Sequence, residues 1–177
     1  MGETRDPQPV KAFVGVLTAR LSLLPRVDQF LRDRLGPIDV ESETLDFDHT
    51  RYYEKEMGSG LKRRFLGFDR LVDPNALVEM KLFTNGLERA LSEEGRRRVN
   101  LDPGYLTAAR VVLASTKDYA HRLYLGRGIY GEVTLLYQDR GFQALPWTYP
   151  DYRSKPYHEF FRRLRGAYLA QIGVKGT

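Results

Sequence analysis

The sequence of 177 residues contains no cysteine, which excludes disulfides, thiolate nucleophiles, iron–sulfur clusters and cysteine-ligated zinc. Metal ligands are therefore limited to Asp, Glu and the three histidines. No apolar run approaches the roughly 18 to 20 residues that span a bilayer, and the start of the chain, residues 1–10, is too polar for a signal peptide. We expect a soluble, cytoplasmic protein without a membrane segment.

Several well-known functional motifs are also missing. The chain has no GxxxxGK[ST] phosphate loop, no GxGxxG after a strand, no HExxH and no GxSxG. The usual sites of P-loop nucleotide hydrolases, dinucleotide enzymes, zinc proteases and serine hydrolases therefore have no support in this sequence.

The composition is that of an ordinary globular protein, with 42% hydrophobic and 29% charged residues. The length fits one domain over residues 1–177, with short disordered tails at 1–10 and 173–177. The net charge is only +5, but residues 96–130 hold seven basic and two acidic side chains. A basic segment with interleaved tyrosines suits a phosphate-bearing partner, although proteins that bind no nucleic acid are often basic too.

Hydrophobic periodicity and turn residues predict the following order of elements. Strands are expected at 12–17, 38–53, 61–68, 99–105, 111–115, 123–125, 129–137 and 142–147, and helices at 25–35, from 73 to about 94, and at 157–172. Asp102-Pro103-Gly104 favours a tight turn at the end of its strand. On the apolar phase of these elements, burial is expected for Val14, Val16, Phe30, Leu87, Val99, Leu101, Val133 and Leu135.

This order predicts an α+β fold. We expect a ferredoxin-like βαββαβ core, extended by an antiparallel β meander, with the helices mainly on one face. A doubly wound parallel sheet is the alternative.

Two aspartates, Asp46 and Asp48, fall on one face of a predicted strand. With a rise of about 3.3 Å per residue they lie roughly 7 Å apart, a spacing that suits a shared divalent cation such as Mg²⁺. The alternative is a solvated strand face.

The segment from Asn100 to Tyr105 brings an amide and the carboxylate of Asp102 to one side of a strand, at its end. Ligands of layered α/β proteins bind at such strand ends. The alternative is that Asn and Asp before Pro-Gly serve only as turn formers.

The richest cluster of reactive groups is Ser115 to Tyr124. Asp118 is placed to orient the imidazole of His121 for acid–base work, and Lys117 and Arg122 are placed to hold a phosphate or carboxylate. The alternative is that these charges simply collect in an exposed loop.

Seven ordered motifs carry a family resemblance. They are 52–58 (YYEKEMG), 99–105 (VNLDPGY), 114–118 (ASTKD), 121–122 (HR), 128–130 (GIY), 132–135 (EVTL) and 147–152 (WTYPDY). Together they resemble the DUF4416 family of bacterial and archaeal proteins from about Lys11 to Tyr168. The resemblance itself implies no particular reaction.

We therefore expect a site for a small phosphate-containing ligand, a nucleotide or the end of an RNA, with the Asn100–Asp102 strand end and the Lys117–Arg122 loop facing each other across one pocket and His121 inside it. Catalysis would make the protein a metal-assisted hydrolase or phosphotransferase. The catalytic candidates are His121, Asp118 and Lys117, the ligand-binding candidates are Asn100, Asp102, Tyr105, Arg122 and Glu132, and the metal candidates are Asp46 and Asp48.

The alternative function is non-catalytic. An RNA-binding module would use exposed tyrosines as stacking platforms together with arginine clusters, and a protein-interaction module would dock through its basic C-terminal helix. The arginines concerned are Arg96, Arg97, Arg98, Arg162, Arg163 and Arg165.

A first prediction concerns the segment from Trp147 to Tyr152. Its aromatic rings carry large apolar areas and its prolines restrict the backbone, so we expect an ordered segment and not a flexible linker. Limited proteolysis of the native protein should leave this segment intact. Cleavage within it before the rest of the chain is attacked would contradict the prediction.

Overall fold

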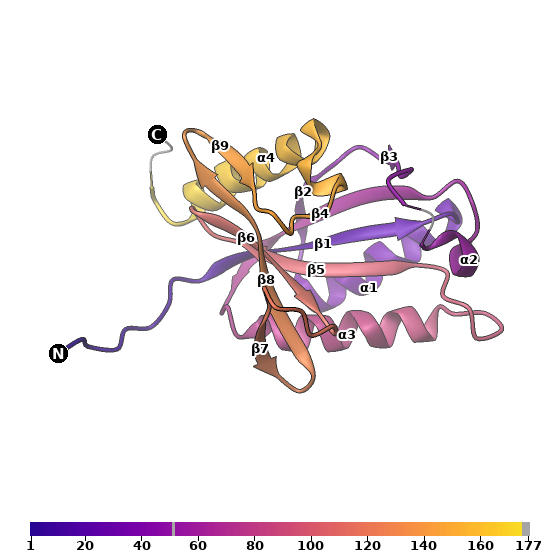
Figure 1. Cartoon of the computed structure of the whole chain (residues 1–177), viewed down its shortest axis with the longest axis horizontal. Coiled ribbons are helices and arrows are strands. Elements are labelled where there is room, and N and C mark those ends of the chain that lie inside the picture. The colour runs from indigo at the N-terminus through magenta and orange to yellow at the C-terminus, as the bar shows by residue number, and fades with distance from the viewer. Residues whose placement is uncertain (51, 175–177) are drawn as a thin grey trace.

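The computed structural model describes residues 1–50 and 52–174, and these form an α+β fold around one large antiparallel sheet (Figure 1). The strands are β1 (Val10–Thr18), β2 (Ile38–Glu41), β3 (Leu45–Asp46), β4 (Lys62–Val72), β5 (Asn100–Leu106), β6 (Arg110–Ser115), β7 (Leu123–Gly126), β8 (Ile129–Gln138) and β9 (Gly141–Ala144). The helices are α1 (Leu24–Leu35), α2 (Glu54–Met57), α3 (Ala76–Ala90) and α4 (Lys155–Gln171), with 3-10 turns η1 (Leu21–Leu23) and η2 (Asp151–Arg153). None of the helices in these ranges is long and apolar enough to cross a membrane.

The strands are ordered β2-β4-β1-β5-β6-β8-β7 across the sheet, with β3 paired to β4 and β9 to β8. Every pair between these strands is antiparallel. The alternative of a doubly wound parallel sheet is therefore wrong. The second half is antiparallel as expected, but it is not a simple meander, because β6 pairs with β8 and not with β7, and both β7 and β9 pair with β8.

The long helices cover both faces of the sheet. Because side chains alternate along a strand, Val14 of β1 packs with α1 and α3, whereas its neighbour Phe13 packs with α4 on the other face. Figure 1 shows α1 and α3 on one side of β1 and α4 on the opposite side. The expectation of helices mainly on one face thus describes α1 and α3 and misses α4.

The expected core positions are buried with two exceptions. Phe30 is 38% exposed, because the buried stripe of α1 runs at intervals of four residues through Val27, Leu31 and Leu35 and leaves Phe30 to one side. Val133 is only half-buried. At the N-terminus, Val10 already belongs to β1 and is buried, and residues 1–9 extend away from the sheet (Figure 1). Of the expected C-terminal tail, residues 175–177 lie outside the described part of the chain.

The expected turn at Asp102-Pro103-Gly104 is wrong, since β5 continues through these residues to Leu106. Each of them pairs with β1, whose residues Phe13 to Gly15 lie opposite. The chain reverses later, at 107–109, where the Thr107 hydroxyl accepts hydrogen bonds from two backbone N–H groups. Pairing with a central strand has overridden the local preference of these residues for a turn.

β5 and β6 separate halfway along their length. They pair only from Gly104 opposite Leu113 to Leu106 opposite Val111, and beyond Gly104 the two strands diverge. Pro103 fits at this point, because its missing N–H faces the side from which β6 has departed. Gly104 fits as well, since a Cβ there would lie 2.5 Å from both the Phe13 ring and the Val112 carbonyl oxygen.

A second prediction follows for Gly104→Ala. The added methyl group meets a backbone oxygen and a fully buried ring, so we expect a loss of roughly 1–3 kcal/mol in unfolding free energy, measured by urea denaturation. Gly166→Ala is the control, because a Cβ on that helical glycine meets nothing within 4 Å. The control should stabilise the protein slightly, by up to about 1 kcal/mol. Equal stability of the two variants would refute the close approach at Gly104.

Candidate functional site

A cavity of about 770 Å³ occupies the space where β5 and β6 diverge. Its walls come from both faces of the sheet, with α3 on one face and the segment before α4 on the other. The polar and aromatic residues that line it are Phe47, His49, Thr50, Tyr52, Tyr53, Arg63, Lys81, Asn85, Glu88, Arg89, Arg97, Asn100, Asp102, Ser115, Thr116, Lys117, Arg122, Glu132, Tyr149, Asp151 and Tyr152. The volume lies in the range of small-molecule sites, and the walls carry more charged side chains than such sites usually do.

One wall is a chain of hydrogen-bonded charges centred on Asp102. Its Oδ2 atom accepts hydrogen bonds from Arg63 at 2.9 Å and from the Asn100 side-chain amide at 2.8 Å. Arg97 in turn donates to Asn100 Oδ1 at 2.7 Å and pairs with Glu56. No described residue donates a hydrogen bond to Asp102 Oδ1, and the Asp102 side chain is 25% exposed. This oxygen is therefore available to a ligand.

The base of the cavity is formed where α3 replaces a missing strand. The backbone N–H of Leu101 donates to Glu88 at 2.6 Å, and its carbonyl accepts from the Lys81 ammonium at 3.0 Å. Lys81 and Glu88 are two helical turns apart on one face of α3, which places one on each polar group of Leu101. The backbone N–H and carbonyl of Leu101, on the edge of β5 that β6 has left, are thus hydrogen-bonded to side chains and not to β6.

The opposite wall is a buried ion pair between Arg122 and Glu132, at 2.8 Å, with the two side chains 1% and 2% exposed. Arg122 also donates to the Ser115 hydroxyl, the Lys117 carbonyl and the Tyr149 hydroxyl. His121 Nε2 lies 2.9 Å from the same carboxylate oxygen, Glu132 Oε2, and the imidazole ring is stacked on Trp147. Glu132, and not Asp118 as we expected, is therefore the residue that orients His121.

Burial and charge shift several pKa values in these walls. Burial raises the pKa of Tyr149, and the nearby charge of Glu132 adds to this effect. Burial also raises the pKa of Glu88 and of Asp151. For Asp102, burial alone would raise the pKa, but the charges of Arg63 and Lys81 and two hydrogen bonds outweigh it, so the pKa is lowered. Asp102 is thus held as a carboxylate.

The structure brings five of the expected site residues to the cavity, namely Asn100, Asp102, Lys117, Arg122 and Glu132. His121 lies behind Glu132 and does not line the cavity. Asp118 is exposed, and Tyr105 packs in an apolar cluster with Leu77, Val112, Ala114 and Ile129.

The two metal candidates lie outside the cavity, where Asp46 pairs with Lys62 and Asp48 is exposed. Within residues 1–50 and 52–174, no group of three or more His, Asp or Glu side chains is arranged to hold a metal ion.

Sequence reasoning missed part of the lining. Lys81 and Arg89 lie on a helix that periodicity marks only as amphipathic, and Tyr53 and Tyr149 come from loops far apart in the chain. Both tyrosines belong to motifs that carry the family resemblance, 52–58 and 147–152. Membership of these motifs was the one signal in the sequence that could have pointed to them as site residues. No local pattern indicated the two cations of α3.

The arginines of the alternative function are mostly engaged within the protein. Arg97 and Arg98 pair with glutamates, and Arg163 and Arg165 donate to backbone carbonyls of Glu41 and Ala108. Arg96 and Arg162 are exposed.

A third prediction concerns the acid dependence of stability. Asp102 has a folded-state pKa below its unfolded value of about 3.9, so its contribution is present above that pH and is lost as pH falls through the folded-state pKa. Asp102→Asn leaves Arg63, 3% exposed, without its closest carboxylate, and should cost about 3 kcal/mol at neutral pH.

The cost of Asp102→Asn should shrink below about pH 4, because the wild type then loses the same contribution. Urea denaturation at a series of pH values measures it. The exposed Asp118→Asn is the matched control and should change stability by less than about 0.5 kcal/mol at any pH. A cost for Asp102→Asn that does not vary with pH would contradict the assigned ion pair.

Comparison with known proteins finds no significant match among curated proteins or solved structures. Residues 8–168, nearly the whole chain, match the family described as "Domain of unknown function (DUF4416)". The match includes β1 through α4 up to Tyr168, and with them every residue that lines the cavity. This protein therefore belongs to the DUF4416 family.

Proposed function

We propose that the cavity binds a small phosphate-containing ligand, a nucleotide or the phosphorylated end of an RNA. The observation that carries the proposal is an excess of unpaired positive charge in the lining. Six basic side chains face four acidic ones, Glu88, Asp102, Glu132 and Asp151. Among the described residues, Arg63, Arg97 and Arg122 have carboxylate partners, whereas Lys81, Arg89 and Lys117 have none within 4 Å.

Cations without a carboxylate partner around a cavity favour an anionic ligand, and here Lys81 is buried in the cavity while Arg89 and Lys117 are exposed at its edge. Lys81 and Arg89 come from α3 and Lys117 from the opposite wall, so an anion between them can be contacted from two sides. Lys81 is 93% buried, and its ammonium donates one hydrogen bond to the Leu101 carbonyl. Two of its three N–H groups are then free to donate to a ligand oxygen. Lys81 already stabilises the nearby Asp102 carboxylate without a direct ion pair, and a phosphate oxygen in the cavity would give it a direct charged partner.

The remaining lining supports a nucleotide over a bare phosphate ion. Phe47, Tyr52, Tyr53 and Tyr149 supply aromatic surface to which a base can pack. Asp102, held as a carboxylate with one free oxygen, accepts a hydrogen bond from an amino or hydroxyl group and repels phosphate. A ligand with an anionic end and a donor-bearing aromatic end fits both parts.

The expected catalytic role stays a prediction. His121 pairs with Glu132, which lines the cavity, but the imidazole itself lies behind Glu132 and outside the lining. The proposal therefore concerns binding, and hydrolysis or phosphoryl transfer with an added divalent metal is a further step beyond it.

We also propose that the first half of the fold is a ferredoxin-like unit. The elements β1, α1, β2, β4, α3 and β5 follow one another as βαββαβ, apart from the short β3 and α2. Their strand order β2-β4-β1-β5, antiparallel throughout, supports this description. On this description, the antiparallel strands from β6 onward are an extension, and the cavity lies at the junction of the ferredoxin-like unit and this extension.

The fourth prediction tests binding with a panel of nucleoside 5′-monophosphates and inorganic phosphate by thermal shift. A ligand at about 100 times its dissociation constant should stabilise the protein by roughly 2.7 kcal/mol, and a nucleotide should exceed inorganic phosphate. Arg89→Gln with Lys117→Gln should weaken binding at least ten-fold, because each removes an unpaired charge.

Arg162→Gln is the matched control, since this arginine is exposed on α4 and far from the lining. It should bind like the wild type. A wild-type protein that none of the panel stabilises, or a double variant that binds as tightly as Arg162→Gln, would refute the proposal.

A further inference from the structure

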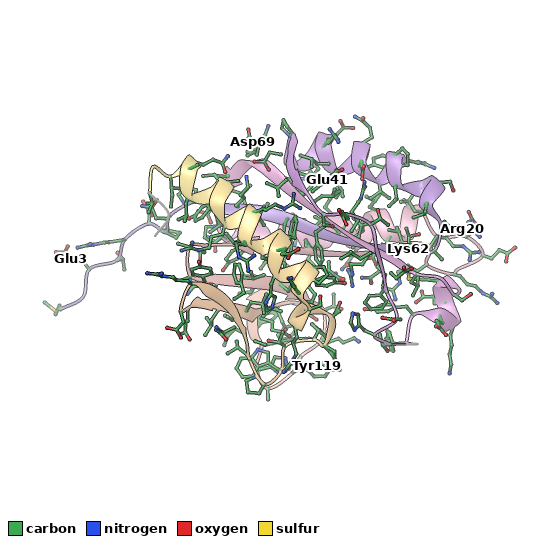
Figure 2. The ribbon with its side chains drawn as sticks, turned by 90° about the horizontal axis from the view of Figure 1, so that it is seen from above. Glu3, Arg20, Glu41, Lys62, Asp69 and Tyr119 are labelled. Carbon is green, nitrogen blue, oxygen red and sulfur yellow. The ribbon has the colours of Figure 1, made fainter. Side chains whose placement is uncertain are left out.

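A group of exposed aromatic side chains surrounds one side of the cavity mouth. We call Tyr52, Tyr119, Trp147 and Tyr149 the aromatic surface. Their exposed fractions are 63%, 51%, 39% and 42%. Figure 2 shows Tyr119 at the edge of the molecule away from Glu41 and Asp69, and Tyr119 belongs to the loop before β7, the last strand in the order of the sheet. Exposed aromatic clusters of this kind mark binding surfaces.

The aromatic surface is continuous with the cavity. Tyr52 and Tyr149 line the cavity itself. The guanidinium of Arg122 donates to the Tyr149 hydroxyl at 2.6 Å and lies 4.6 Å from the centre of the Tyr119 ring. His121 then connects Tyr119, at 6.0 Å between ring centres, to Trp147, at 5.3 Å in a stacked arrangement.

Two of these rings, Trp147 and Tyr149, are held in place by hydrogen bonds. The Trp147 indole donates to the Val133 carbonyl at 2.9 Å, and its stacking partner His121 is fixed by Glu132. Arg153 donates to the carbonyls of Leu145, Pro146 and Thr148 and so fixes the loop that carries Trp147. A rigid exposed ring loses little conformational entropy when a partner stacks on it.

The charges beside the rings favour a polyanion. Among the described residues, neither Lys117 nor Arg153 has a carboxylate within 4 Å, and the Lys117 ammonium lies 5.0 Å from the centre of the Tyr52 ring. Asp118 is the acidic residue in the same loop and is exposed. Rigid rings interleaved with unpaired cations are how proteins bind single-stranded nucleic acid, the bases stacking and the phosphates meeting the cations.

We propose that the aromatic surface binds the nucleotides of a single-stranded oligonucleotide whose terminal phosphate occupies the cavity. This inference rests on the proposed function, and it states that the natural ligand is a strand end and not a free nucleotide. RNA and DNA share the chemistry concerned, so the test separates them.

The experiment compares ligands of two lengths on the same protein. Dissociation constants are measured by fluorescence anisotropy for eight-nucleotide RNA and DNA strands that carry a 5′-phosphate, a 3′-phosphate or no terminal phosphate. The fluorophore is placed at the end opposite the phosphate, and the unphosphorylated strand is prepared with the label at either end. Nucleoside monophosphates serve as competitors. The wild type should bind one terminally phosphorylated strand at least ten-fold more tightly than its mononucleotide and than the unphosphorylated strand. Its affinity should fall as salt is raised.

Two variants separate the aromatic surface from the cavity. Trp147→Ala and Tyr119→Ala should each weaken strand binding about 5- to 100-fold, because each removes a stacking platform. Neither residue lines the cavity, so mononucleotide binding should be unchanged. Trp147→Phe and Tyr119→Phe keep a ring and should restore most of the affinity. Tyr124→Ala is the matched control, a tyrosine on β7 that is 63% exposed and lies outside the aromatic surface.

The outcomes distinguish the two proposals. If mononucleotides bind but the strand binds no more tightly, or if Tyr119→Ala binds the strand like Tyr124→Ala, the further inference fails and the proposed function stands. If neither mononucleotide nor strand binds, both fail, and the aromatic surface is left to a protein partner. Equal affinity for phosphorylated and unphosphorylated strands would overturn the placement of the terminal phosphate in the cavity.

Discussion

β5 pairs with β6 over only three residues, and the cavity depends on what becomes of the backbone groups left over. A strand in the middle of a sheet would normally find partners for them on both sides, and an unpaired buried N–H or carbonyl is costly. Here α3 supplies the partners, Glu88 for the N–H and Lys81 for the carbonyl of Leu101. The strands can therefore diverge without leaving unsatisfied groups, and the space between them becomes available to a ligand.

The use of α3 side chains as hydrogen-bond partners for β5 also makes the cavity charged. Placing Lys81 and Glu88 against a strand brings ionised groups into the interior, and Arg63, Asp102, Arg122 and Glu132 add to them. Most of these charges pair off, as buried charges must. Each of the four acidic side chains in the lining has a cation within 4 Å, whereas three of the described cations there, Lys81, Arg89 and Lys117, have no carboxylate within that distance. That imbalance is the physical basis for assigning an anionic ligand to this cavity.

Much of the fold could be predicted from the sequence, because α1, α3, α4 and most strands show their own periodicity. The errors occur where distant segments override local preference. Asp102-Pro103-Gly104 has turn chemistry, but pairing with β1 keeps it extended. Asp118 is near His121 in sequence, but an antiparallel partner strand brings Glu132 to the imidazole instead. The cations of α3 line the site because β5 and β6 diverge. That divergence depends on the pairing of distant strands, so no local sequence pattern predicts it.

One guanidinium links the interior of the cavity to the surface outside it. Arg122 donates in four directions, to Glu132, to Ser115, to the Lys117 backbone and to Tyr149, while its flat face lies near the Tyr119 ring. A lysine has three donors on a single atom and no flat face, so it could not hold β6, β8 and both loops at once. The position of this cavity wall and the positions of the Tyr149 and Tyr119 rings therefore depend on the same side chain. The spacing between the wall and these two rings is fixed in advance for a ligand that contacts both.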